Sequence, residues 1–206
     1  MRLGTKTSCV IAVALLVTVV SCRRATKDPL VSIAEKYNAG NFVSLADFYR
    51  ETAGVKLSLK GVVVEVEQAA GPALLDAIRA EYVNVMPFRI EKNYGSEGKK
   101  DRVAVIKSMD QFELVEALKT SGKEDKVSTE SIVKALKAID ASARIRINGA
   151  GADFVEFTFT VPPADWTAIA KECAAIAPNI VIYGTGTVKK LESEMRQYNG
   201  AVLWWY

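Results

Sequence analysis

The residues that could do chemistry gather in the last part of this chain, residues 162–206, and they fit the binding of a ligand. The run Gly184-Thr185-Gly186-Thr187 precedes a helical pattern, so its backbone N–H groups and hydroxyls could hold an anion at the helix N-terminus. The run lacks the spacing of the phosphate-binding loops G-x-G-x-x-G and G-x-x-x-x-G-K-[ST]. A tight turn followed by a helix cap is therefore the favoured interpretation, and an anion site is the alternative.

The same part of the chain carries polar and aromatic side chains around that turn. Five of them are the candidate ligand-binding residues: Asn179, Tyr183, Thr185, Thr187 and Trp205. Trp204, Trp205 and Tyr206 could form an aromatic platform for a sugar, a peptide or a neighbouring lipoprotein. Because successive side chains of a strand point to opposite faces, at least one of the three rings should belong to the core.

The chain contains no histidine, and this excludes several classes of enzyme. Ser-His-Asp and Cys-His catalysis and histidine-containing zinc sites all require an imidazole. Any enzyme here would have to use carboxylates, Lys, Tyr or an oxygen-bound metal ion. Asp153, Glu156 and Glu172 are the acids that could form a carboxylate pair, but their spacing matches no catalytic motif. We therefore expect no catalytic residue, no metal site and no cofactor.

Two helices and a strand must position these C-terminal residues. Apolar residues recur at three- and four-residue spacing from Trp166 to Ala177, and Cys173 lies on that apolar face, where we expect a buried thiol. A second helix should start after the N-cap Thr187 and end at Asn199-Gly200. Residues 201–206 carry no charge, which predicts a strand that is central or covered on both faces rather than an exposed edge. The whole stretch predicts a βαβ-like closure.

The upstream sequence alternates strand and helix patterns. Strands are expected at residues 57–66, 85–91, 102–107, 143–148 and 154–160, and helices at 30–37 and 43–52 and after residues 71, 108 and 128. Ser108 and Gln111 fit a capping box, and Ser128 fits an N-cap. The order predicts one α+β domain, with a mixed, mainly antiparallel sheet packed with helices. Residues 85–118 and 143–177 are similar strand-strand-helix units, which allows an internal duplication.

Several short blocks resemble an uncharacterised bacterial family, domain of unknown function 4253. The blocks span about the last 120 residues and include Asn93-Tyr94-Gly95, residues 101–106, 110–114 and 129–133, residues 177–181, Gly184-Thr185-Gly186-Thr187, and Leu203-Trp204-Trp205. The family tends to carry Cys-Pro-Asp, a Gln before the Gly-rich turn, and Trp-Trp-Asp. This chain has Ala177, Asn179, Tyr183 and Tyr206 at the corresponding positions. The resemblance therefore implies a fold, and a family site at those positions would be altered or lost here.

The N-terminus has the features of a bacterial lipoprotein signal peptide. Residues 1–21 carry Arg2 and Lys6, followed by an uncharged run of 13 residues from Cys9. That run is shorter than the about 20 apolar residues that span a bilayer. It ends in Val19-Val20-Ser21-Cys22, which resembles a lipobox, so we expect lipidation at Cys22. An ordinary signal peptide and an uncleaved anchor are the alternatives.

The rest of the chain divides into a lipid tether at residues 22–29, a helical segment at 30–54 and the α+β domain at 55–206. Arg23 after the lipidated cysteine would favour the outer membrane in a Gram-negative cell, and the cell membrane is the other destination. Removal of residues 1–21 lowers the formal net charge from +3 to +1, which gives no reason to expect nucleic acid as a partner.

The sequence thus predicts an exported, lipid-anchored cell-envelope protein that binds an envelope protein or a small ligand without catalysis. The alternatives are a carboxylate-dependent hydrolase or transferase, and an immunity or scaffold protein.

Overall fold

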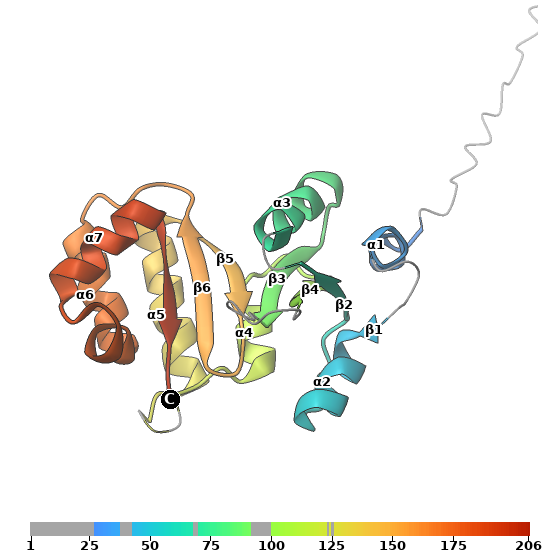
Figure 1. Cartoon of the computed structure of the whole chain (residues 1–206), viewed down its shortest axis with the longest axis horizontal. Coiled ribbons are helices and arrows are strands. Elements are labelled where there is room, and N and C mark those ends of the chain that lie inside the picture. Colours follow the sequence, from blue (N-terminus) through green and yellow to red (C-terminus); the bar gives the residue numbers. More distant parts are fainter. Residues whose placement is uncertain (1–26, 38–42, 68–69, 92–99, 123, 125) are drawn as a thin grey trace, which may run out of the picture.

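A computed structural model describes residues 27–37, 43–67, 70–91, 100–122, 124 and 126–206. Residues 1–21 and Cys22 lie outside the described residues, as does the Asn93-Tyr94-Gly95 block of the family resemblance. The predicted α+β class is confirmed, because the described residues form one mixed, open sheet with helices packed on it (Figure 1). No helix within them is long and apolar enough to cross a membrane.

Helices and strands alternate along the chain, much as the sequence predicts. The helices are α1 (Pro29–Tyr37), α2 (Leu45–Ala53), α3 (Gly71–Glu81), α4 (Glu113–Leu118), α5 (Thr129–Ala143), α6 (Trp166–Ile176), the π-helix η2 (Ile180–Thr185) and α7 (Val188–Tyr198). The strands are β1 (Val43–Ser44), β2 (Gly61–Val66), β3 (Met86–Glu91), β4 (Asp101–Ile106), β5 (Ile145–Ala150), β6 (Phe154–Phe159) and β7 (Gly200–Trp204).

The sheet consists of two antiparallel halves joined by one parallel pair. Its strand order is β1-β2-β4-β3-β5-β6-β7. Only β3 and β5 run parallel, and a single register pair, Arg89 opposite Gly149, joins them. We call this junction the seam. Because so few sheet hydrogen bonds cross it, other contacts must hold the two halves in place.

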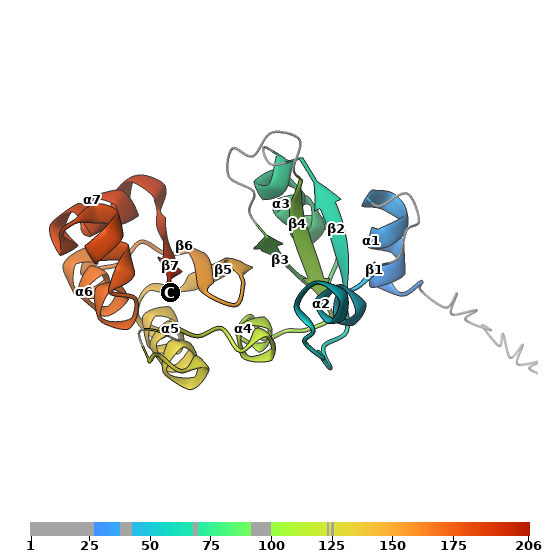
Figure 2. The same ribbon diagram turned by 60° about the horizontal axis from the view of Figure 1, so that its bottom comes forward.

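The two faces of the sheet are covered differently. The larger core lies on one face and includes side chains from α2, α4, α5, α6 and α7. The smaller core lies on the opposite face, where α1 packs over β2 and α3 packs over β4 and β3. Figure 2 shows α3 and α1 over the first half of the sheet, with α6 and α7 beside the second half. The face of β5 and β6 that points away from the larger core is therefore lined by polar residues, among them Arg146, Asn148, Glu156 and Thr158.

In the C-terminal segment, β6 is followed by α6, η2 and α7, and the chain then returns to the sheet as β7. β6 and β7 pair directly in antiparallel orientation. Residues Ile180–Thr185, which include the first two residues of the Gly-rich turn, form the π-helix η2. The expectation that the last strand avoids the edge is wrong, since β7 is the last strand of the described sheet. Its apolar residues instead pack one face into the larger core, where Leu203 is fully buried.

Local chemistry sets several helix ends as predicted. The hydroxyl of Ser128 accepts from the backbone of Ser131 at the start of α5, and that of Thr187 accepts from Lys190 at the start of α7. Asn199 ends α7 in the left-handed conformation, with φ 50°. The two strand-strand-helix units occur as β3–β4–α4 and β5–β6–α6, and both of their helices pack into the larger core.

The predicted capping box is wrong. α4 begins only at Glu113, and Ser108 accepts a hydrogen bond from the backbone of Asp110. The Gln111 side chain bonds to β5 instead, donating to the carbonyl of Ile145 at 3.2 Å and accepting from the N–H of Ile147 at 3.0 Å. Both the N–H and the oxygen of the Gln111 side-chain amide thus bond to the backbone of β5. These distant partners replace the predicted bond to the helix N-terminus.

The predicted helix at residues 43–52 starts two residues later than expected. Val43 and Ser44 form β1, which pairs with β2, and α2 follows with Ser44 as its N-cap. The segment at residues 30–54 therefore contributes two helices and a strand to the same body as the rest of the chain.

Candidate functional site

Two of the predicted ligand-binding residues belong to the interior. Trp205 is only 2% exposed, and its indole N–H donates to the carbonyl of Ile176 at 2.7 Å. Asn179 is 3% exposed. One of the three C-terminal rings thus lies in the core, as predicted, and that ring is Trp205. A buried indole that already has its hydrogen-bond acceptor has no face to offer a ligand.

The Gly-rich turn is used by the fold itself. The Thr185 hydroxyl lies 3.1 Å from the carbonyl of Thr187 and 3.4 Å from that of Ile180. Thr187 caps α7, and Gly186 has φ 77°, which favours glycine. The Thr185 hydroxyl is therefore bonded within the turn, and the Thr187 hydroxyl oxygen serves as the cap of α7.

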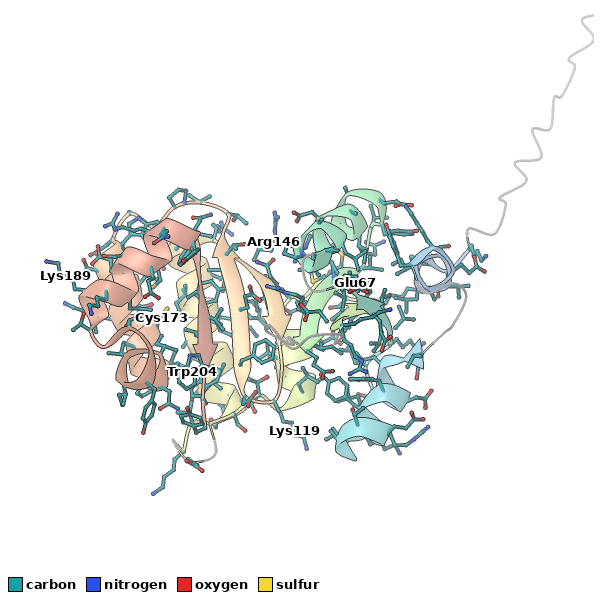
Figure 3. All side chains as sticks on the ribbon, viewed as in Figure 1. Glu67, Lys119, Arg146, Cys173, Lys189 and Trp204 are labelled. Atoms are coloured by element: carbon teal, nitrogen blue, oxygen red, sulfur yellow. The ribbon has the colours of Figure 1, made fainter. Side chains whose placement is uncertain are left out.

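Tyr183 is brought together with two other aromatic residues at the surface. Its ring centroid lies 6.4 Å from that of Trp204 and 5.4 Å from that of Tyr206, and the last two are 5.2 Å apart. Tyr183 and Tyr206 remain 66% and 57% exposed. We call Tyr183, Trp204 and Tyr206 the aromatic cluster. Figure 3 shows Trp204 on β7, at the end of the chain.

A groove of about 750 Å³ lies beside the aromatic cluster. Trp204 and Val202 of β7 form part of its wall, and Phe48 and Tyr49 of α2 also line it. Phe154 lines it as well, and its remaining lining residues are Thr52, Ile90, Glu91, Arg102, Gly151, Ala152 and Asp153. We call this the aromatic groove. It is built from α2, β3, β4, the β5–β6 turn and β7, so no single stretch of sequence contains it.

Two charged groups of the aromatic groove, Arg102 and Glu91, are already paired with each other. Arg102 forms ion pairs with Glu91 and, at 3.2 Å, with Glu65, and its guanidinium lies 5.3 Å from the ring centroid of Phe48. Burial opposes the charged form of Arg102, yet the bonds and charges of Glu91 and Glu65 raise its pKa overall. Burial, together with the charge of Glu91, raises the pKa of Tyr49 well above its ordinary value. Tyr49 is therefore a neutral hydrogen-bonding group at neutral pH.

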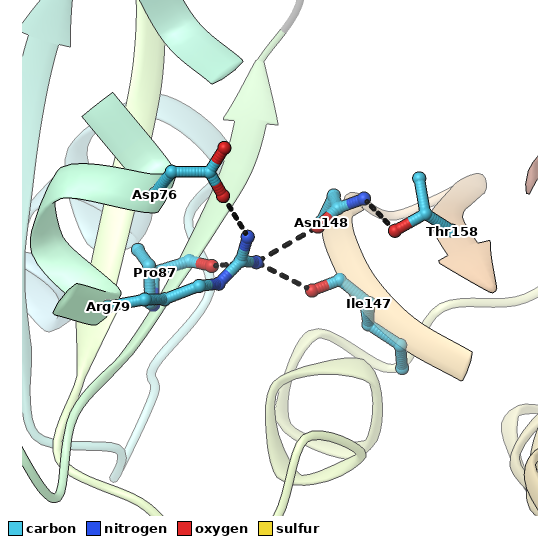
Figure 4. Close-up of polar contacts among 6 residues, drawn as sticks. All are labelled: Asp76, Arg79, Pro87, Ile147, Asn148 and Thr158. Carbon is cyan, nitrogen blue, oxygen red and sulfur yellow. Dashed lines mark hydrogen bonds and ion pairs between the residues drawn. The ribbon is translucent and has the colours of Figure 1, made fainter. Parts of the chain in front are cut away.

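A second cavity, of about 590 Å³, lies at the seam, on the face of the sheet away from the larger core. Arg79 of α3 reaches across the seam to β5 (Figure 4). Its Nη2 donates to Asn148 Oδ1 at 3.0 Å and to the carbonyls of Ile147 at 3.2 Å and Pro87 at 3.4 Å. Its Nη1 lies 3.4 Å from Asp76. We call this the seam cavity.

Buried charges also cross the seam. Arg89 of β3 pairs with Glu156 of β6 and lies 4.0 Å from Asp101 of β4. The side chains of all three are at most 16% exposed. A buried ion pair of this kind fixes the positions of its partners because separating them would leave an uncompensated charge. The floor of the seam cavity is therefore held in one geometry.

The three acids considered as a catalytic pair occupy separate places. Asp153 lies in the β5–β6 turn, Glu156 is bound to Arg89, and Glu172 is exposed on α6. Within the described ranges, no group of three or more Cys, Asp or Glu side chains is placed to hold a metal ion. Cys173 is fully buried, as predicted, and burial together with the nearby Glu172 raises its thiol pKa to about 12. That thiol is a packing group.

The seam cavity was not predicted from the sequence, although one sequence pattern indicated it. Arg146 and Asn148 alternate with buried isoleucines on β5, and Glu156 and Thr158 alternate with buried residues on β6. This alternation marks one polar face on each strand. Nothing local indicated that Arg79, 69 residues before Asn148, would meet that face.

Comparison with known proteins identifies a family but no characterised relative. No curated protein and no solved structure matches the chain. One family model matches residues 102–206, from β4 to the C-terminus. That range contains β5, β6 and β7, whereas α2, α3 and β3 precede it. Because the match covers just over half of the 206 residues, this chain belongs to the family described as a domain of unknown function, DUF4253.

Proposed function

We propose that this chain is a lipid-anchored protein of the bacterial cell envelope that binds a peptide segment of another envelope protein in its aromatic groove. The observation that carries the proposal is the exposed aromatic cluster at the rim of that groove. Ligand sites are concave, mostly apolar and equipped with a few fixed polar groups. Tyr and Trp are also the residues that contribute most to protein recognition surfaces.

The groove fits a peptide better than a sugar ring stacked on a flat aromatic platform. Trp204 and Tyr206 meet at 79° and Tyr183 and Tyr206 at 73°, so the exposed rings do not form one flat platform. Phe48, Phe154 and Trp204 instead leave a cleft that an apolar side chain could enter. Glu91 and Arg102 offer polar contacts for the backbone of the bound segment. Peptide-binding surfaces combine such an apolar pocket with fixed polar partners.

The enzyme alternative has less support. A hydrolase or transferase using carboxylates needs two acids at one place, with one of them able to move a proton. Asp153, Glu156 and Glu172 lie at separate places, and Glu156 is held by Arg89. Asn179 is 3% exposed whereas Tyr183 is 66% exposed, so these two candidate residues do not share one open surface near the Gly-rich turn. An immunity or scaffold protein would also act by binding, so the identity of the bound partner will distinguish these alternatives.

Lipidation is tested by the N-terminus of the mature chain. We expect mass spectrometry of the full-length chain, produced in a bacterial host, to find a diacylated N-terminal Cys22 in the membrane fraction. The Cys22→Ser variant should keep residues 1–21 and carry no acyl chain. Cys9→Ser, which changes a cysteine of the signal peptide, should be processed normally. A native product without acyl chains would refute the anchor.

The groove is tested by photo-cross-linking in intact cells. A photoreactive phenylalanine analogue at Val202, which lines the groove and is 38% exposed, should give one discrete protein adduct. The same analogue at Val83, which is 81% exposed and lies outside the groove, should give none. Adding Trp204→Ala to the Val202 variant should reduce the adduct strongly. Equal adducts from both positions, or an adduct that is insensitive to Trp204→Ala, would contradict the proposed site.

A further inference from the structure

The seam cavity is separate from the aromatic groove, because the two share no lining residue. We propose that it is a second binding site, which takes a small molecule bearing a carboxylate group between the guanidinium groups of Arg79 and Arg146. This inference goes beyond the proposed function, since it concerns a different surface and a different class of ligand.

The first argument is the balance of charge at this end of the cavity. Arg146 is exposed on β5 and makes no ion pair with any described residue. Figure 3 shows its side chain between β5 and α3. Among the described residues, the only acid that pairs with Arg79 is Asp76, at 3.4 Å, and its side chain is 75% exposed. Two guanidinium groups therefore face one carboxylate, and a single added negative charge would balance them.

The two arginines are close enough to affect each other. Burial lowers the pKa of Arg79, and the positive charge of Arg146 lowers it further, against the opposite effect of Asp76. A bound carboxylate would replace this repulsion with two attractive contacts. Guanidinium and carboxylate groups also match geometrically, because two parallel N–H groups can donate to two oxygens.

The second argument is the direction of the hydrogen bonds. Asn148 accepts from Arg79 through Oδ1 and donates through Nδ2 to the hydroxyl oxygen of Thr158 at 3.0 Å (Figure 4). The two bonds together fix which way the amide points. Because the Thr158 oxygen is the acceptor, its own proton remains available, and it donates to no described residue. Thr158 lines the cavity, so this proton is a third donor for an anion.

The lining also indicates what the rest of the ligand must be. Arg89 and Glu156 also line the cavity but pair with each other, so Arg79, Arg146 and Asp76 together leave one positive charge, which a doubly charged anion such as phosphate would exceed. Leu75, Pro72 and Phe159 add apolar surface next to the charged groups. A single carboxylate on a small hydrocarbon or ring satisfies both features. The volume of about 590 Å³ admits a molecule of that size.

The inference is tested by titrating the full-length chain, purified in detergent, with sodium propionate, sodium benzoate and inorganic phosphate at constant ionic strength. We expect saturable heats from both carboxylates in isothermal calorimetry and weaker binding of phosphate. Arg146→Gln should weaken carboxylate binding about ten- to a hundredfold, the loss of one charge-assisted contact. Arg50→Gln, which removes an exposed arginine of α2, should leave binding unchanged.

A second pair of variants tests the hydroxyl donor. Thr158→Val keeps the shape of the side chain but removes the donor, so carboxylate affinity should fall, whereas Thr158→Ser should retain it. The inference is overturned if neither carboxylate binds, if phosphate binds at least as tightly, or if Arg146→Gln binds as the parent does. Trp204→Ala should not alter carboxylate binding. Lost carboxylate binding with normal cross-linking from Val202 would therefore reject this site and leave the proposed function standing.

Discussion

Replacing Trp205 by alanine is expected to lower the free energy of unfolding by about 3–5 kcal/mol, the range for removing a large aromatic side chain from a core. Trp205 is the largest fully buried side chain among the described residues. Gly122 packs so closely against its indole that a Cβ there would lie 2.8 Å from the ring. The variant also leaves the carbonyl of Ile176 without its donor. Urea denaturation followed by circular dichroism measures the change.

The neighbouring tryptophan is the matched control. Trp204→Ala removes the same atoms one residue earlier, from the aromatic cluster at the surface, and should cost about 1 kcal/mol. Trp205→Phe keeps most of the ring but loses the indole N–H, so it should fall between the two alanine variants. Equal losses for Trp204→Ala and Trp205→Ala would mean that the terminal strand is not anchored as described.

These two tryptophans also illustrate how far the sequence could predict the fold. Alternation along a strand required that at least one C-terminal ring be buried, but it could not say which one. That choice depends on the register with β6, where Phe154 pairs with Trp204. Register is a property of two distant strands. The helix caps at Ser128 and Thr187 were predictable because their partners lie three residues away.

Where a local and a distant partner compete, the sequence shows only the local one. Gln111 has the spacing of a capping box with Ser108, yet its amide bonds to two backbone groups of β5. The edge position of β7 was missed for a related reason. An uncharged strand predicts burial, but η2 and the aromatic cluster provide part of that cover at the edge of the sheet.

The candidate sites were hidden by the same separation in sequence. The aromatic groove combines α2 with β7, and the seam cavity combines α3 with β5 and β6. The Gly-rich turn looked more like a binding site because its polar groups are adjacent. The fold instead uses those groups to start α7. Adjacent polar residues can satisfy each other, whereas groups brought together from distant elements can be left facing a cavity.

Arg79→Met should lower the free energy of unfolding by about 2–4 kcal/mol, because it removes a charged donor from buried acceptors. Methionine keeps the aliphatic stem of the side chain but leaves the carbonyls of Ile147 and Pro87 and the amide oxygen of Asn148 without this donor. Since a single register pair joins β3 to β5, the loss should concentrate at the seam. Hydrogen exchange should therefore rise most in β3 and β5, and thermal unfolding should show the global change.

Arg146→Met separates this structural role from the effect of charge. It removes an arginine from the same cavity, but Arg146 makes no ion pair with a described residue, so stability should change by no more than about 0.5 kcal/mol. Arg79→Lys should resemble Arg79→Met, because a single ammonium cannot span acceptors on both β3 and β5 as a guanidinium does. If Arg79→Met changed neither stability nor exchange at the seam, the two halves would have to be held together by their other contacts, the Arg89–Glu156 pair and the larger core. A Glu156→Gln variant should then produce the loosening expected here from Arg79→Met.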